Sequence, residues 1–444
     1  MTPNSSRDQP YNSRAVVRET GIKPDTLRAW ERRYGLPKPT RSAGGHRLYS
    51  QRDINTLKWL AARQEEGLSI SRAVKLWHSF EAQKQDPLEE VPLPLSGAND
   101  NLILGGKNLQ RLREQWIAAL LDYEETLADR ILSQAFAMFP VERVCFQIMQ
   151  KGLSEIGELW HAGAISVQQE HFTTEHVTTR LSGLLLAAPL PTKSDRLLIL
   201  CPPSEEHAFA PKLLTLLLKR SGFAVYYLGT NTPLEQLPAT LKQIRPQMVI
   251  ACAQQLDSAS NLIDTGKLLD EHKIPFGFGG YIFNCLPELH KHIPGHFLGE
   301  HLEQAQSNIV TLIARGIQRN EGISITEQYT LALGHFQDAA HQIASGTEIS
   351  LANSAIPPSL VWYTINHLNK SICAALKIGE IELLTHDLNW LYKLMINRGT
   401  SSSDAQNIFR AFSQSAQDHL SSNESFLLDW LSMTAQDIQK EPLK

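Results

Sequence analysis

Histidines, glutamates and a tryptophan gather in residues 159–176, where the chain reads LWHAGAISVQQEHFTTEH. These residue types can hold a metal ion, bind a ligand or simply pack within a helical core. His171 and His176 are five residues apart, which separates them by about 140° around a helix axis. Helical zinc pairs use closer spacings, and no His-Glu-x-x-His motif accompanies these histidines. The spacing argues against zinc and leaves a ligand pocket or a packed core.

A second group with chemical capacity stands further along the chain, where Glu205-x-His207 follows an apolar run. Short apolar runs that alternate with helical segments predict buried strands of an open parallel sheet. The strands are predicted at 196–201, 223–228, 247–252 and 275–279. Such sheets bind ligands outside the carboxyl ends of their strands. The residues predicted at that edge are Glu205, His207, Gly229, Gly279 and Gly280.

The elements that must position these residues fall into several segments, so the fold class is a multidomain α and α/β protein. Apolar residues recur every three or four positions before and after the predicted sheet, which indicates helices on both sides of it. The predicted segments are a head at 1–82, a linker at 83–104, a helical bundle at 105–192, a Rossmann-like (flavodoxin-like) sheet domain at 193–318 and a second helical domain at 319–444.

Size and composition agree with this division. A chain of 444 residues with 42% hydrophobic and 20% charged residues has the make-up of a soluble protein of three or four domains. Neither a run long enough to span a bilayer nor the apolar core of a signal peptide is present, which favours a cytoplasmic protein without a membrane partner. The five cysteines are scattered, without a Cys-x-x-Cys pair. Neither a disulfide framework nor a thiolate zinc site is indicated.

Charge separates the head from the rest of the chain. Residues 1–80 hold 15 Lys+Arg against 7 Asp+Glu, a balance of +8, whereas the remainder holds 27 against 39, a balance of −12. A basic head on an acidic body favours contact of the head with a polyanion. In the head, Ser13 is expected to cap a short helix and Pro24 to open a second, with Ser50 and Asp53 starting a third. Two short helices across a tight turn predict a helix-turn-helix.

The stretch TLRAWERRYGLPKPTRSAGGHRLYS resembles the MerR-type winged helix-turn-helix. This resemblance implies double-stranded operator DNA as the partner. It places Arg28, Arg32 and Tyr34 on the recognition helix at the major groove, and Arg41, Arg47 and Tyr49 on the wing facing phosphates and the adjoining groove. Members of the family bind palindromic operators as homo-oligomers, so a dimer or tetramer is implied.

The Glu205-x-His207 motif, followed by YLGTNTP and FGGYIF, resembles the cobalamin-binding Rossmann-like domain shared with methionine synthases and corrinoid proteins. The resemblance implies that His207 is the lower ligand of cobalt and that Glu205 influences its hydrogen bonding. Two positions depart from the family pattern. Ala210 replaces the last glycine of the signature, and Ala253 replaces a serine at the end of the third strand. Both changes bear on the space and hydrogen bonding available to the nucleotide tail of the cofactor.

Trp160 followed after nine residues by Glu170-His171 resembles the CarH/LitR type of cobalamin-dependent photoreceptor repressor, which has the same order of domains. The resemblance covers roughly residues 11–317. It implies adenosylcobalamin, or another cobalamin, as cofactor. By the same resemblance Trp160 covers the upper adenosyl group and Val167 lines its pocket, while Glu170 and His171 make polar contacts there. It also implies that His161 becomes the upper cobalt ligand after light breaks the cobalt–carbon bond.

The sequence therefore predicts a non-enzymatic transcriptional regulator controlled by a corrinoid, in the form of a light-sensing repressor. One alternative is a MerR-type regulator that has weakened or lost cobalamin binding and is controlled by protein partners. Another is a corrinoid enzyme such as a methyltransferase, which explains the middle of the chain but not its basic head. The C-terminal helices at 319–444 have an apolar stripe typical of a core, and they leave open whether a protein partner binds there.

Overall fold

The computed structural model describes residues 11–20, 22, 24–41, 45, 47–65, 70–82, 103–315 and 322–437. These residues fall into two compact units. The first consists of the chain up to 119 together with 126–149, and the second consists of 120–125 together with the chain from 150 onward. The predicted linker at 83–104 lies almost wholly outside the described residues. Within the described part, no helix is both long and apolar enough to cross a bilayer.

The head is a winged helix-turn-helix, as the sequence predicts. Its elements are β1 (Tyr11–Asn12), α1 (Ser13–Thr20), α2 (Pro24–Tyr34), β2 (Thr40–Arg41), β3 (Arg47–Tyr49), α3 (Gln51–Glu65) and α4 (Ile70–Ala82). The three strands form an antiparallel sheet in the order β1-β3-β2, and the β2-β3 pair is the expected wing. Leu27 and Trp30 of α2 enter the head's apolar core.

The start of α3 agrees with the sequence prediction, whereas the cap of α1 differs from it. Ser50 accepts from the Asp53 amide at 3.1 Å while the Asp53 carboxylate accepts from the Ser50 amide at 2.9 Å, the predicted capping box. The cap of α1 is not Ser13, which lies inside the helix. Asn12 takes this role, because its Oδ1 accepts from the Ala15 amide at 2.9 Å. Asparagine and serine cap equally well, so the sequence alone did not separate the two neighbours.

Helices then follow in succession, as the spacing of apolar residues predicts. They are α5 (Ile103–Leu121), α6 (Glu125–Met138), α7 (Val141–Val144), the π-helical turn η1 (Cys145–Gln150), α8 (Lys151–His161) and α9 (Val167–Leu186). Ser166 begins α9 with a capping box, in which its side chain accepts from the Gln169 amide. This capping box fixes the end of the turn that joins α8 to α9 at Ser166.

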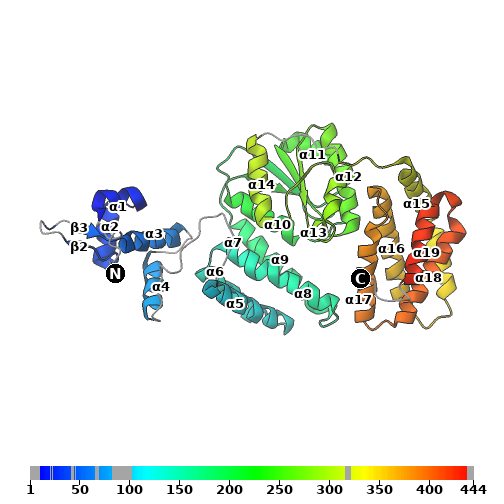
Figure 1. The fold of residues 1–444 in the computed structure, drawn as a ribbon, viewed down its shortest axis with the longest axis horizontal. Coiled ribbons are helices and arrows are strands. Elements are labelled where there is room, and N and C mark those ends of the chain that lie inside the picture. The colour runs from blue at the N-terminus through cyan, green and yellow to red at the C-terminus, as the bar shows by residue number, and fades with distance from the viewer. Residues whose placement is uncertain are drawn as a thin grey trace, which may run out of the picture. The chain divides into compact units, whose positions relative to one another are not determined.

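The sheet domain has five parallel strands in the order β5-β4-β6-β7-β8. Its elements are β4 (Arg196–Leu200), α10 (Phe209–Arg220), β5 (Ala224–Tyr227), α11 (Leu237–Ile244), β6 (Met248–Cys252), α12 (Leu256–Glu271), β7 (Phe276–Gly279), α13 (Ile282–Cys285), η2 (Pro287–His292), β8 (His296–Phe297) and α14 (Leu302–Arg315). Alternate strand residues face opposite apolar clusters, one including side chains of α10 and α14, the other of α11 and α12. Helices cover both faces of the sheet (Figure 1). The central strands β4, β6 and β7 are almost wholly buried, whereas the edge strands β5 and β8 are only partly buried.

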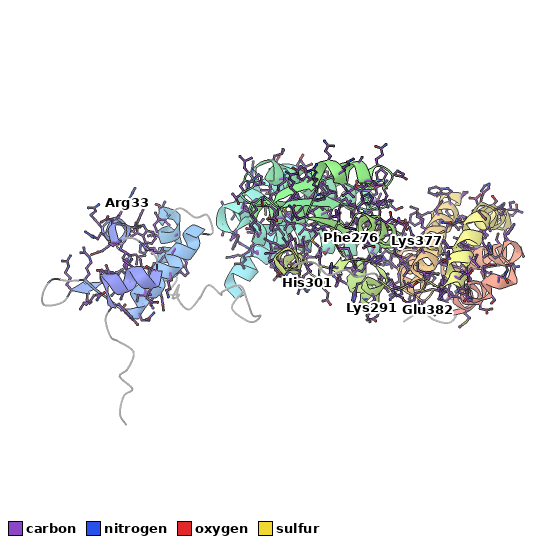
Figure 2. The ribbon with its side chains drawn as sticks, turned by 90° about the horizontal axis from the view of Figure 1, so that it is seen from above. Arg33, Phe276, Lys291, His301, Lys377 and Glu382 are labelled. Atoms are coloured by element: carbon purple, nitrogen blue, oxygen red, sulfur yellow. The ribbon has the colours of Figure 1, made fainter. Side chains whose placement is uncertain are left out.

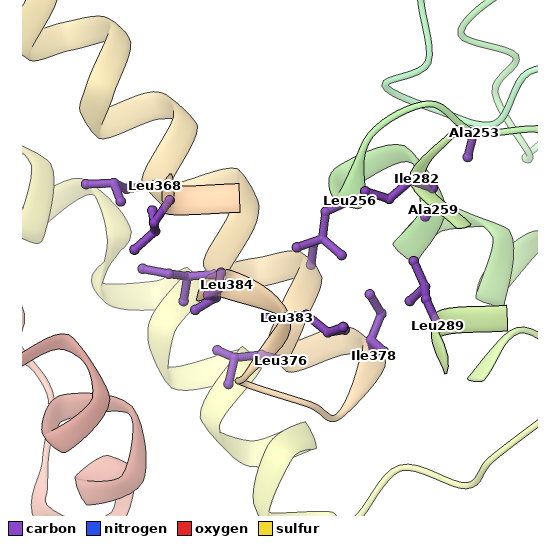
Figure 3. Close-up of a cluster of buried hydrophobic side chains, with 14 of the residues drawn as sticks. Ala253, Leu256, Ala259, Ile282, Leu289, Leu368, Leu376, Ile378, Leu383 and Leu384 are labelled. Atoms are coloured by element: carbon purple, nitrogen blue, oxygen red, sulfur yellow. The ribbon is translucent and has the colours of Figure 1, made fainter. Parts of the chain in front are cut away.

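The C-terminal helices pack as a second helical domain. They are α15 (Glu327–Leu351), α16 (Pro358–Ile378), α17 (Leu383–Asn397), α18 (Ser402–His419), the short η3 (Ser422–Glu424) and α19 (Ser425–Asp437). Their core is continuous with that of the sheet domain, since one cluster of buried side chains includes Leu256 of α12 together with Leu376 and Ile378 of α16 (Figure 3). Figure 2 shows Lys377 where α12 and α16 meet, and there it pairs with Asp264 at 2.5 Å.

Candidate functional site

Glu205 lies in the loop after β4 and is almost fully buried, with 1% of its surface exposed. Its Oε2 accepts from the Ser258 hydroxyl and from the Gln254 amide, each at 2.6 Å. Its Oε1 accepts from the His207 amide at 2.8 Å and lies 2.6 Å from His207 Nδ1. The carboxylate thus ties the loop after β4 to the loop after β6, and it orients one histidine.

His207 is held by one ring nitrogen and leaves the other available. Nδ1 faces Glu205, and the described residues provide no hydrogen-bond partner for Nε2. The side chain is 56% exposed, so Nε2 has room for a ligand. The hydrogen bond with Glu205 raises the pKa of His207 while burial lowers it, and the net direction is upward. A carboxylate that fixes Nδ1–H is the arrangement that orients a metal-binding imidazole through Nε2.

The predicted glycines differ in what surrounds them. A methyl group at Gly229 or Gly279 would meet nothing within 4 Å among the described residues. At Gly280 the same methyl would lie 1.7 Å from the Ala253 carbonyl oxygen, and φ is +138°. Gly279 and Gly229 therefore border open space at the sheet edge, whereas Gly280 is required by the backbone beneath it.

The two departures from the cobalamin-domain pattern have different places in the structure. Ala253 is fully buried, and its amide donates to the Gly279 carbonyl at 2.9 Å. Ala210 lies at the second position of α10 and is partly buried. Although Ala253 lacks the hydroxyl of the serine that it replaces, Ser258 in the first turn of α12 supplies a hydroxyl that donates to Glu205. The sequence did not single out Ser258, and its spacing after β6 gave no signal for it.

Trp160 and His161 form the end of α8, before a turn that leads to α9. Trp160 Nε1 is buried and has no hydrogen-bond partner in the described part of the chain. His161 Nε2 lies 3.2 Å from the carbonyl oxygen of Trp390, in α17. Arg398, just after α17, donates to the Trp160 carbonyl at 2.7 Å. These contacts with the C-terminal helices were not predicted, because the family pattern ends before those helices begin.

The start of α9 carries Val167, Glu170 and His171, the other residues expected to contact the upper adenosyl group. Val167 is 39% exposed, and the His171 side chain is 75% exposed. Glu170 accepts from the Thr174 hydroxyl at 2.7 Å and lies 3.2 Å from His171 Nδ1. Glu170 also contributes to the upward shift of the His207 pKa. The start of α9 and the His207 loop are therefore close enough to interact electrostatically.

On the head, four arginines expected at DNA are accessible to different degrees. Arg28 is exposed and pairs loosely with Asp25 at 3.6 Å, and Arg32 and Arg41 are exposed. Arg47 is partly engaged, because its Nε lies 2.6 Å from Glu31 and this contact raises its pKa.

The two tyrosines expected at DNA, Tyr34 and Tyr49, differ in burial. Tyr34, half-buried, lies under the guanidinium of Arg33 at 5.6 Å. Tyr49 corrects the sequence-based expectation, since only 2% of it is exposed and it packs in the apolar core with Leu27 and Trp30. Burial further raises the pKa of Tyr49. Its position gives it a packing role rather than a place on the DNA-facing surface of the wing.

Comparison with known families gives two matches. The family described as MerR HTH family regulatory protein matches residues 11–79. The family described as B12 binding domain matches residues 112–184. The first match spans the winged head, and the second covers most of the helical segment that carries Trp160, Glu170 and His171.

Comparison with individual proteins gives longer matches. The HTH-type transcriptional repressor CarH of Myxococcus xanthus is 31% identical over 258 residues, covering 58% of this chain and 83% of that protein. The repressor CarA of the same organism is 33% identical over 239 residues, covering 53% and 74%. The solved monomethylamine corrinoid protein of Methanosarcina barkeri is 16% identical, covers 46% of this chain and 98% of its own, and has a TM-score of 0.40.

Proposed function

The chain belongs to the family of MerR-type, B12-binding transcriptional repressors that includes CarH and CarA, and we propose that adenosylcobalamin and light set its binding to operator DNA. In this proposal the cofactor-loaded protein assembles in the dark into a dimer or tetramer, occupies a palindromic operator in the cytoplasm and represses. Illumination dissociates the assembly. In this proposal the chain acts as a regulator and catalyses no reaction.

The observation that carries the proposal is the Glu205–His207 pair. A buried carboxylate fixes Nδ1 at 2.6 Å, and Nε2 has no hydrogen-bond partner among the described residues, on a side chain that is 56% exposed. The pair lies at a sheet edge where Gly229 and Gly279 border open space. This donor set fits a cobalt ion held by a neutral imidazole below a planar macrocycle. The unpartnered buried Nε1 of Trp160 supplies a donor that an adenosyl group could satisfy.

Each side chain then has a defined task. His207 would hold cobalt from below, Glu205 would keep its ring oriented, and Trp160 with Val167 would cover an upper ligand. Glu170 and His171 would supply polar contacts to that ligand, and His161 would become a ligand once it departs. The bound cofactor supplies a cobalt–carbon bond that visible light breaks. Arg28, Arg32, Tyr34, Arg41 and Arg47 would contact DNA.

The experiment is an absorption spectrum of the purified protein with adenosylcobalamin, recorded before and after green light, with sedimentation and operator binding measured in parallel. The operator probe is a duplex selected in the dark from a random-sequence library. We expect His207→Ala to weaken corrinoid binding or change its lower ligation. His161→Ala should leave dark binding intact and alter only the spectrum after illumination. Sedimentation and DNA binding that ignore both cofactor and light would refute the proposal.

The spectrum and the operator-binding measurement also test the first alternative, and a substrate-turnover assay tests the second. A protein that binds the selected duplex without retaining a corrin absorption band is a regulator controlled by other partners, as the changes at Ala210 and Ala253 could produce. A cobalamin-loaded protein that demethylates a methylated substrate would instead be a corrinoid enzyme. We favour the photoreceptor repressor, because the chain has both the Glu205–His207 pair and exposed arginines where the resemblance expects DNA contacts.

A further inference from the structure

The end of α17 and the residue after it hold the turn that follows α8. Arg398 donates from Nη2 to the Trp160 carbonyl at 2.7 Å and from Nη1 to the Ile165 carbonyl at 3.3 Å. Its guanidinium carbon also lies 5.1 Å from the centre of the Trp160 ring. A single arginine therefore fixes the backbone at both ends of the turn as well as the indole at its start.

His161 is held from the same side. Its Nε2 lies 3.2 Å from the Trp390 carbonyl oxygen, and its ring centre is 5.4 Å from that of Trp390. Because a carbonyl oxygen only accepts, this contact requires a proton on Nε2. Asn397 donates from Nδ2 to the His161 carbonyl at 2.9 Å. A methyl group at Gly163 would lie 2.3 Å from the Asn397 carbonyl oxygen, so the turn and the helix end fit closely.

The helix end that makes these contacts is anchored to the sheet domain. α16 packs along α12, and Lys377 donates to Asn261 at 2.7 Å. Apolar side chains of α16 and α17 continue the core of the sheet domain (Figure 3). The C-terminal helices thus contact α12, whose first turn binds Glu205 through Ser258, and the end of α8.

We propose that Trp390, Asn397 and Arg398 form a dock for the turn at 160–165, and that the turn must leave this dock before His161 can bind any other partner. His161 cannot contact Trp390 and bind a metal ion through the same nitrogen, since Nε2 carries a proton in the contact with the Trp390 carbonyl and offers its lone pair to a metal ion. Arg398 is a positioning residue, because its contacts are with the turn and with the Trp160 ring. That His161 leaves the dock to bind cobalt rests on the proposed function, whereas the dock itself rests on the contacts described above.

The first test uses the full chain without cofactor. Amides of Ala162, Gly163 and Ala164 donate to carbonyls of α8, so their hydrogen exchange reports how often the turn opens. We expect Arg398→Ala to speed exchange in this turn by about tenfold, the effect of losing one or two hydrogen bonds. Arg410→Ala removes an equally charged, exposed side chain of α18 and should leave that exchange unchanged. Equal exchange in Arg398→Ala and the parent would overturn the dock.

A second variant approaches the dock from the other side. Gly163→Ala places a methyl against Asn397 and should also speed exchange in the turn, whereas Gly399→Ala has similar backbone strain, with φ of +86°, but meets nothing within 4 Å in the described structure. A Gly163→Ala protein with parental exchange would contradict the close fit. Thermal melts followed by circular dichroism verify that all variants are folded.

The last test adds adenosylcobalamin. We expect Arg398→Ala to bind it in the dark as the parent does and to reach its final spectrum after green light about tenfold faster, because the turn no longer has to leave the dock. A parent protein that shows no corrin band, or no response to light, refutes the proposed function but not the dock. A parent that responds to light at the same rate as Arg398→Ala refutes the role of the dock in the response.

Discussion

Gly279 and Gly280 are neighbours at the end of β7, yet they are constrained in different ways. A methyl at Gly280 would overlap the Ala253 carbonyl oxygen at 1.7 Å in a backbone conformation that disfavours side chains, whereas one at Gly279 would enter open space. Gly279 is therefore free of packing constraints from the described residues, and its surroundings are suited to a ligand. Gly280 is needed for the fold.

Substituting each glycine separates the two roles. We expect Gly280→Ala to lower the free energy of unfolding by about 3 kcal/mol or more, through overlap and backbone strain. Gly279→Ala should keep the parental melting curve and weaken adenosylcobalamin binding, because its methyl occupies space at the proposed site. Circular dichroism melts and absorbance titrations in the dark measure the two effects. Undiminished cobalamin binding by Gly279→Ala would show that the cofactor does not lie against this strand end.

At the scale of elements, the sequence predicted most of the helices and strands that position the site. Continuous apolar runs predicted the buried strands, and Ser50 with Asp53 predicted the start of α3 because both partners of a capping box are local in sequence. Tyr49 was placed wrongly, since a tyrosine on a short strand gives no sign of which face it occupies until the core around it is built. The α17 dock depends on residues more than 220 positions apart, as the separation of 229 between His161 and Trp390 shows. No local pattern encodes such a contact.

Asp387 joins α16 to α17 and carries a prediction about acid stability. Its Oδ2 lies 2.8 Å from His367 Nε2 and also accepts from the Ser371 hydroxyl. Burial raises the pKa of this carboxyl, but the hydrogen bonds from His367 and Ser371, together with the nearby charges of His367 and His386, outweigh burial and hold the pKa below the ordinary aspartate value. A carboxyl with a lowered folded-state pKa stabilises the fold above its unfolded-state pKa, and that contribution is lost as pH falls through the folded-state pKa.

We therefore expect Asp387→Asn to lower the free energy of unfolding at pH 7 by about 1.5 to 3 kcal/mol, the range for hydrogen bonds to a charged group. The difference from the parent should begin to shrink as pH falls below about 4, the ordinary aspartate pKa, because the unfolded parent then takes up a proton. It should be lost once pH falls below the folded-state pKa, where the folded carboxyl is protonated as well. Urea unfolding at a series of pH values measures this. Asp429→Asn, an equal change of charge at an exposed position of α19, is the control. A difference that stays constant down to pH 2 would show that the charge of Asp387 is not what stabilises the helix pair.

At the scale of the whole molecule, charge and chemistry are segregated along the chain. The basic head carries the arginines expected at DNA, while His207, Trp160 and the α17 dock belong to the second compact unit. A regulator of this kind needs a coupling free energy between the two sites, because a ligand that binds all states of the protein equally shifts none of them. Couplings of this kind amount to roughly 1 to 3 kcal/mol, or about 5-fold to 150-fold in affinity.

Linkage makes this coupling testable from either end. If adenosylcobalamin raises the affinity for the selected operator duplex in the dark by some factor, the duplex must raise the affinity for adenosylcobalamin by the same factor, provided that both titrations are done at one protein concentration and one salt concentration. We expect that factor to lie in the range above and to disappear when a scrambled duplex of equal length replaces the operator, because phosphate contacts alone do not report the state of the head. Titrating adenosylcobalamin by absorbance with each duplex present measures the factor. A cofactor affinity that is identical with operator and scrambled duplex would mean that corrinoid and operator bind independently, and that control of this regulator has to come from another partner.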